Sequence, residues 1–332
     1  MTASLPSLSS RAHARRPRRT PAEVVVRRVD PPAPSVPTRA ANLLLAGVSH
    51  SLAGTLASGL GRHPQVCLPS PRRIDRFTPL RYGLDVEAPL EDYDRHFAGW
   101  DGERYRLESS PVYFDGGHAL VAAVARDLPD VRVLLLLRDP AQRLWTSYAD
   151  KVRRGRLPAA MPYETFVDRC LALRAGGSDR FEANRYFRTL GSGFYAEHLP
   201  AWLDTFAGRV RVVFAEHLAV DPARELADAV RWLGLDPDEL PPSAHDAAEA
   251  EAACPPAPRS TLATVVGRLW PLAQRSAAAV TADPVGERLG TPRQPDRDRN
   301  RVQALYARAN RDLAALLRSY GYDRLPDWLL DA

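Results

Sequence analysis

The sequence predicts a single α/β domain in which a parallel β-sheet is flanked by helices on both faces. Short apolar runs alternate with amphipathic segments along most of the chain, as in folds where strands and helices follow one another. The run at 133–137 is apolar at every position, which is typical of a parallel strand covered on both sides. The chain has 332 residues, 45% of them hydrophobic and 26% charged, so it can form one large globular domain.

The alternation begins with the strand-like run NLLLAG from Asn42. A glycine-containing loop and a helix that ends near Gly61 and Pro64 follow it. The later predicted elements are a strand at 105–108, a helix at 117–127, a strand at 131–138, a helix at 140–154, helical pieces within 162–206, a strand at 210–214 and a helix at 222–235. Ligands of open parallel sheets bind beyond the carboxyl ends of the strands, so the loop after NLLLAG is the first place to expect a site.

The two ends of this domain have a different composition. Residues 1–40 contain seven prolines and eight arginines against two acidic side chains, which predicts a disordered basic Arg/Pro-rich tail. The domain is expected to occupy 41–332. Within it, 236–300 is Pro- and Ala-rich and predicts an irregular insertion, and 299–320 is patterned as a closing helix.

Charge and the single lysine exclude several function classes. Outside the tail the net charge is −1, so nucleic-acid binding is not expected to be the primary role. Lys151 is the only lysine beside 44 arginines and lies in YADKVRRG, which excludes an ordinary P-loop nucleotide site of the form G-x-x-x-x-G-K-[ST].

Cysteine spacing and hydropathy suggest the compartment. Cys67, Cys170 and Cys254 form no C-x-x-C pair, which favours unpaired thiols in a reducing compartment over a zinc site. No apolar run reaches 18 residues and no signal-peptide pattern follows the N-terminus, so we expect a cytoplasmic protein without stable membrane insertion. The oligomeric state cannot be read from the sequence.

Several motifs resemble those of the sulfotransferase family. GVSHSLAGTL resembles the family's 5′-phosphosulfate loop, and the match continues without a gap from Gly47 to Pro64. VLLLLRDPAQRLWTSY resembles its 3′-phosphate segment, and RLESSPVYF at 106–114 is similar to the E-K-[ST]-P-x-Y-[FL] strand of heparan sulfate sulfotransferases and their bacterial relatives. GFYAEHLPAWLDTF, VVFAEHLAVDP and LYARANRDLAALL resemble further family segments in the same order. The resemblance covers about 41–235 and 299–328.

This resemblance implies a P-loop-like parallel fold with one catalytic domain. It also implies 3′-phosphoadenosine-5′-phosphosulfate as co-substrate, no metal, and transfer of a sulfuryl group to a hydroxyl or amine of a carbohydrate or small-molecule acceptor. Backbone N–H groups at the start of a helix suit such a polyanion. The implied donor-binding residues are Ser49, His50, Ser51, Leu52, Ala53, Gly54, Thr55, Arg138 and Thr146.

The 5′-phosphosulfate loop departs from the family pattern at several positions. His50 stands where the family has Lys or Arg beside the leaving group, and it can supply a positive charge there only when protonated. Leu52 stands where the family has Gly, so its Cβ could obstruct the approach of phosphate to the backbone. Ala53 and Gly54 replace hydroxyl residues.

The resemblance also places a candidate general base. Glu108 matches the family's acidic residue at the end of a short strand and would face the crevice. The neighbouring lysine of the family is Ser109 here. His217 and His118 are alternative bases outside any matching motif.

Two other functions remain open at this point. A non-catalytic relative could bind adenosine phosphates or a protein partner if the altered loop no longer supports transfer. A tethering protein could use its basic tail on a membrane or nucleic acid, although the near-neutral body gives this hypothesis little support.

Overall fold

The computed structural model describes residues 39–70, 72–86, 89–176, 186–241, 284–292 and 294–331. Five parallel strands form one sheet in the order β2-β3-β1-β4-β5. The strands are β1 (Leu43–Leu45), β2 (Val66–Cys67), β3 (Tyr105–Ser109), β4 (Arg132–Leu137) and β5 (Val210–Phe214). The predicted parallel α/β class is therefore confirmed.

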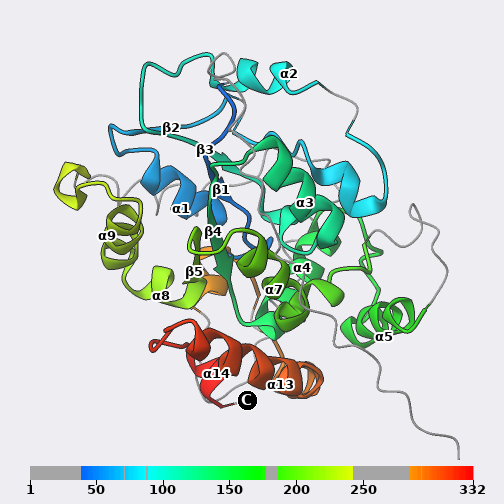
Figure 1. Ribbon diagram of the computed structural model, residues 1–332. Helices are drawn as coiled ribbons and strands as arrows, with labels where there is room; N and C mark the ends of the chain where they lie inside the picture. Colours follow the sequence, from blue (N-terminus) through cyan, green and yellow to red (C-terminus); the bar gives the residue numbers. More distant parts are fainter. Residues whose placement is uncertain are drawn as a thin grey trace, which may run out of the picture. The chain divides into compact units, whose positions relative to one another are not determined.

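Helices cover both faces of this sheet (Figure 1). Helices α1 (Ala53–Leu60), α8 (Ala215–Val220) and α9 (Pro222–Trp232) pack on one face, and α3 (Gly117–Asp127) and α7 (Tyr195–Thr205) on the other. A third cluster joins α4 (Pro140–Arg153), α5 (Tyr163–Arg174) and α13 (Asp296–Ser319). The described ranges also contain the short α-helices α2 (Glu91–Asp94), α12 (Pro284–Arg288) and α14 (Asp327–Leu330).

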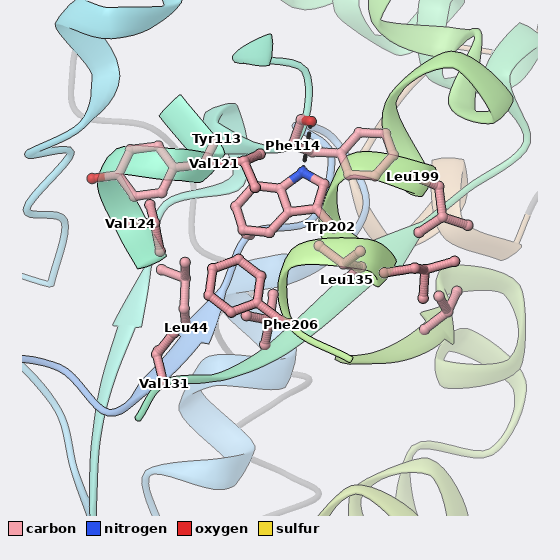
Figure 2. Close-up of a cluster of buried hydrophobic side chains, with 14 of the residues drawn as sticks. Leu44, Tyr113, Phe114, Val121, Val124, Val131, Leu135, Leu199, Trp202 and Phe206 are labelled. Atoms are coloured by element: carbon pink, nitrogen blue, oxygen red, sulfur yellow. Dashed lines mark hydrogen bonds between the residues drawn. The ribbon is translucent and has the colours of Figure 1, made fainter. Parts of the chain in front are cut away.

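Trp202 of α7 is the largest side chain in the core on the α3 and α7 face. It is completely buried, and Figure 2 shows its ring beside Phe114 and Phe206, with its indole Nε1–H donating to the Phe114 carbonyl at 3.0 Å. The N–H of a buried indole usually finds such a hydrogen-bond partner. The tryptophan therefore anchors α7 to the segment that follows β3.

The predicted boundaries agree closely with the structure where local signals are strong. Helix α4 begins at Pro140 after Asp139, whose carboxylate accepts the N–H of Ala141 at 2.8 Å as an N-cap. The closing helix begins three residues before its predicted start at 299. Ala40, assigned to the tail, is buried in the core. Residues 1–38 of the tail, Cys254 and the helical stretch expected near 261–281 lie outside the described residues.

Neither a membrane-spanning helix nor a metal-binding cluster is found in these described ranges. None of the helices described there is long and apolar enough to cross a membrane. Nor do three or more His, Cys, Asp or Glu side chains of the described segments gather as a metal site requires.

Candidate functional site

The candidate site lies where adjacent strands end. β1 pairs in parallel with both β3 and β4. Beyond β1 the chain continues along β4, because the N–H of Val48 donates to the carbonyl of Leu136 at 2.9 Å. The loop at 47–52 is thereby fixed beside the end of β4, where Arg138 follows.

Gly47 permits this close approach. A Cβ at this position would lie 2.5 Å from the nitrogen and 2.7 Å from the oxygen of Leu136. These are backbone atoms of a buried strand and cannot move aside without separating the two chains. The glycine that opens GVSHS is therefore required by sheet packing.

The loop turns through two residues with left-handed backbone conformation. His50 has φ 65° and Leu52 has φ 64°, conformations that cost a non-glycine residue about 1–2 kcal/mol. Leu52 is also the N-cap of α1 and makes no side-chain capping hydrogen bond. The first N–H groups of α1 thus lack an intrahelical partner and suit an anion.

The side chain of Leu52 points into the core and does not occupy the space where phosphate would approach the loop. It is 3% exposed and packs in the apolar cluster beneath α1, with Leu56 and Leu45 among its members. The family glycine at this position is explained by the positive φ. Leucine at this position has a strained backbone, but its buried side chain stabilises the apolar cluster beneath α1.

We therefore expect Leu52→Gly to destabilise the fold without improving donor binding. The variant relieves about 1–2 kcal/mol of backbone strain but removes a buried leucine, which costs about 2–5 kcal/mol even when alanine replaces it. Chemical denaturation should show a lower free energy of unfolding. A rise in nucleotide affinity would instead mean that the leucine does block the site.

The other loop residues divide into internal and accessible ones. Ser51 is 1% exposed, and its hydroxyl donates to the carbonyl of Val48. Ala53 and Thr55 are also buried, whereas Ser49 is half-buried and Gly54 exposed. The hydroxyls of Ser51 and Thr55, expected to face a ligand, are thus placed inside the protein.

Arg138 connects the end of β4 to the loop. Its side chain is completely buried, and its Nη1 donates to the carbonyl of His50 at 2.8 Å. Its own carbonyl accepts the hydroxyl of Tyr195, the tyrosine of the GFYAEHL segment, at 2.7 Å. The structure therefore brings Arg138 and His50 together, and Tyr195 holds the backbone from which the arginine extends.

Thr146 lies two turns into α4. Its hydroxyl donates to the carbonyl of Gln142 at 3.1 Å and accepts the hydroxyl of Thr291 at 3.3 Å. Thr291 comes from the segment between α12 and α13, which our sequence analysis did not connect with the site. Because Thr146 and Thr291 are 145 residues apart in the chain, no local sequence pattern indicates that they meet.

A group of cations surrounds His50. Burial lowers the pKa of His50 to about 3, and the charges of Lys151, Arg143 and Arg138 lower it further, while Asp150 opposes them. The imidazole is therefore neutral at pH 7 in the ligand-free protein. The resemblance to sulfotransferases instead implies a positively charged side chain at this position. The cations that act on His50 come from α4 and from Arg138, the residue that follows β4.

Lys151 and Arg143 belong to one polar network. The Lys151 ammonium donates to the Ser147 hydroxyl at 2.5 Å, this hydroxyl lies 3.1 Å from that of Thr189, and Arg143 Nη2 donates to the Thr189 carbonyl at 2.6 Å. Burial, with the Arg143 charge, lowers the pKa of Lys151 to about 7. The buried Nε of Arg143 has no hydrogen-bond partner among the described residues.

Glu108 is completely buried and does not face an open crevice. Its carboxylate accepts hydroxyl hydrogen bonds from Tyr113 and Ser110, both at 2.7 Å, and from Tyr93. Burial raises its pKa to about 7, although the hydrogen bonds from Tyr113 and Ser110 act in the opposite direction. The carboxyl group can therefore both bind and release a proton near neutral pH.

The alternative bases occupy other places. His217, on α8, packs its ring against Phe214, and burial lowers its pKa. His118 is exposed near the start of α3. Asp75, which our sequence analysis passed over, has φ 53° and donates its backbone N–H to Ser110, the neighbour of Glu108. Residues with a strained backbone are common at functional sites. The strain at Asp75 is visible only in the structure.

Two pockets adjoin these elements. One of about 220 Å³ lies beside the first turn of α1 and is lined in part by Gly54, Arg72 and Ser109. The other, of about 610 Å³, is lined in part by Tyr93 and Arg76. Tyr93 thus stands between the larger pocket and the carboxylate of Glu108.

A parallel sheet whose strand ends carry a helix N-terminus and buried arginines is typical of proteins that bind phosphorylated nucleotides. No family model matches the chain. The bifunctional heparan sulfate N-deacetylase/N-sulfotransferase 1 of Caenorhabditis briggsae is 27% identical over 213 residues, and that of Mus musculus 28% over 201. The matched regions are 61% and 58% of this chain but only 23% and 22% of the relatives.

A solved structure supports the same assignment of the fold. The sulfotransferase of Alicyclobacillus acidocaldarius superposes with a TM-score of 0.60 and 21% identity, over 87% of this chain and 98% of that one. The fold is thus that of a sulfotransferase. The sequence relatives and this solved structure agree that the chain is similar to sulfotransferases.

Proposed function

We propose that the protein transfers a sulfuryl group from 3′-phosphoadenosine-5′-phosphosulfate to a hydroxyl or amine acceptor. The observation that carries this proposal is the group of positive charges that acts on His50, two of them on the buried arginines Arg138 and Arg143. Arg138, Arg143 and Lys151 act together on this imidazole, beside the free N–H groups at the start of α1. Positive charge gathered beside the N-terminus of a helix favours an anionic ligand, and a donor with phosphate and sulfate groups would supply one.

Different residues are assigned to the two anionic ends of the donor. We assign Arg138 and Thr146 to the 3′-phosphate, where a guanidinium and a hydroxyl can both donate hydrogen bonds. The backbone N–H groups at the start of α1, with Ser49 and Gly54, are assigned to the 5′-phosphosulfate. Bound donor supplies the sulfuryl group: its bond to the phosphate oxygen breaks, a bond from sulfur to the acceptor oxygen or nitrogen forms, and the nucleotide bisphosphate leaves with the electron pair.

Glu108 is our candidate for the group that takes the acceptor's proton. Its raised pKa, about 7, suits a general base that works near neutral pH. The carboxylate must first be uncovered, and Tyr93 is the side chain that separates it from the 610 Å³ pocket. We therefore propose this pocket for a carbohydrate or small-molecule acceptor, whose hydroxyl would displace that of Tyr93.

Replacing Arg138 by alanine tests the donor assignment. Loss of a charge-assisted hydrogen bond costs about 1.5–3 kcal/mol, so we expect at least tenfold weaker binding of 3′-phosphoadenosine-5′-phosphate. Binding of AMP, which lacks the 3′-phosphate, should change much less. Isothermal titration calorimetry measures both affinities.

The matched control is Arg132→Ala, at the other end of the same strand. Arg132 donates to the Trp232 carbonyl at 2.8 Å, so its loss should lower stability but leave nucleotide affinity unchanged. Equal binding of the two nucleotides by the wild-type protein would contradict the proposed donor. Binding of the bisphosphate without transfer to any acceptor would favour the non-catalytic alternative.

A further inference from the structure

We propose that Lys151, the only lysine of the chain, is a donor-binding residue that supplies the positive charge at the 5′-phosphosulfate end of the site. This inference rests on the proposed function and adds a residue to it. No motif match assigned a role to this lysine. Its position in the structure does.

The first argument is placement. Lys151 lies one helical turn after Ser147 on α4, the helix that also carries Thr146 and Arg143. Its ammonium shares a hydrogen-bond network with Arg143 through Ser147 and Thr189. Among the charges that shift the pKa of His50, that of Lys151 has the largest effect. Lys151 is thus one of the cations of α4 whose charge acts on His50 of the 5′-phosphosulfate loop.

The second argument is charge. The adjacent carboxylate of Asp150 pairs with Arg153 at 2.5 Å and Arg154 at 2.6 Å, so two exposed arginines already compensate it. The ammonium of Lys151 also lies 5.6 Å from the centre of the Phe166 ring, an arrangement that favours a cation. His50, which occupies the family's cationic position in the loop, is neutral. Lys151 is therefore available to offset negative charge on the leaving phosphate.

The titration of Lys151 gives a direct readout. Its ordinary pKa is lowered to about 7 mainly by burial, and Arg143 and Arg156 lower it too, while Cys170 of α5 and Asp150 raise it. On the loop, the facing titratable group is His50. A bound polyanion must raise the pKa of Lys151, so binding takes up a proton at neutral pH and weakens by about fivefold between pH 7 and pH 8.

A single lysine permits a measurement without mutation. In the full chain labelled with ¹³Cε-lysine, one resonance reports the titration of Lys151. We expect 3′-phosphoadenosine-5′-phosphate to raise the pKa of Lys151 by at least one unit, and adenosine 3′-monophosphate to leave it nearly unchanged. Inorganic sulfate serves as a third ligand, and an equal response to sulfate alone would overturn a nucleotide-specific role.

Variants provide the second measurement. Lys151→Met should weaken binding of the bisphosphate at least tenfold and spare adenosine 3′-monophosphate, whereas Lys151→Arg should keep affinity but lose the pH dependence. Arg301→Met, which removes an exposed cation paired with Asp168, is the matched control. If the methionine variant does not fold, the lysine resonance alone decides.

The outcomes separate the two proposals. Absence of nucleotide binding by the wild-type chain contradicts the proposed function itself. Binding with an unmoved Lys151 resonance overturns only the role of the lysine. Equal weakening of both nucleotides by Lys151→Met also overturns it, because the charge would then not act at the 5′ end.

Discussion

Glu108→Gln is expected to reduce turnover by about 10²–10⁴ while nucleotide affinity stays close to that of the wild-type protein. This range is typical for loss of a general base. The amide keeps the shape of the carboxyl group and can still accept hydroxyl hydrogen bonds from Tyr113 and Ser110, but it cannot take a proton. The rate is measured with the first acceptor that the wild-type protein sulfates.

A second readout tests the raised pKa of Glu108 itself. The pKa of Glu108 is raised in the folded protein, so its protonated form stabilises the fold at low pH. That contribution is complete below its ordinary pKa and is lost as pH rises to about 7. The free energy of unfolding of the wild-type protein, relative to Glu108→Gln, should therefore fall across this window whether or not Glu108 is catalytic.

Only the rate identifies the catalytic role. Glu225→Gln changes another buried carboxylate whose pKa is raised by burial, on α9, and should leave turnover unchanged. Tyr93→Phe should keep the base and remove one of its hydrogen bonds, so its activity should stay well above that of Glu108→Gln. Normal turnover by Glu108→Gln would move the proton acceptor to Asp75 or His217.

Much of the fold could be predicted because its signals are local. The continuous apolar run of β4, the cap at Asp139 and the proline that follows it fix the start and end of elements within a few residues. β2, with only two residues, has no periodicity to detect. Its position at the edge of the sheet depends on its pairing with β3, a non-local contact.

The site was harder to predict because its side chains are placed by distant segments and by backbone conformation. The sequence located Arg138 at the end of a strand, but it did not reveal that Leu52 turns into the core because of its positive φ. The carboxylate of Glu108 accepts a hydrogen bond from Tyr93 of α2, a non-local contact. Lys151 looked unremarkable because its neighbours His50 and Cys170 come from other elements.

Gly47→Ala is expected to have the largest effect on stability. The added methyl group would lie within 3 Å of three atoms of Leu136, two of them backbone atoms of β4. Relief requires the loop to move away from the strand, which breaks the hydrogen bond from Val48 to Leu136. Overpacking of this kind costs about 3 kcal/mol or more, so the variant should unfold at much lower denaturant concentration.

Gly99→Ala is the matched control for this substitution. Gly99 is exposed, and a Cβ there meets no atom within 4 Å, so its replacement should change the free energy of unfolding by less than about 0.5 kcal/mol. If Gly47→Ala were as stable as this control, the loop would not be fixed against β4. The contact between His50 and Arg138 would then be adjustable, and a loop of that kind could not hold preformed N–H groups for an anion.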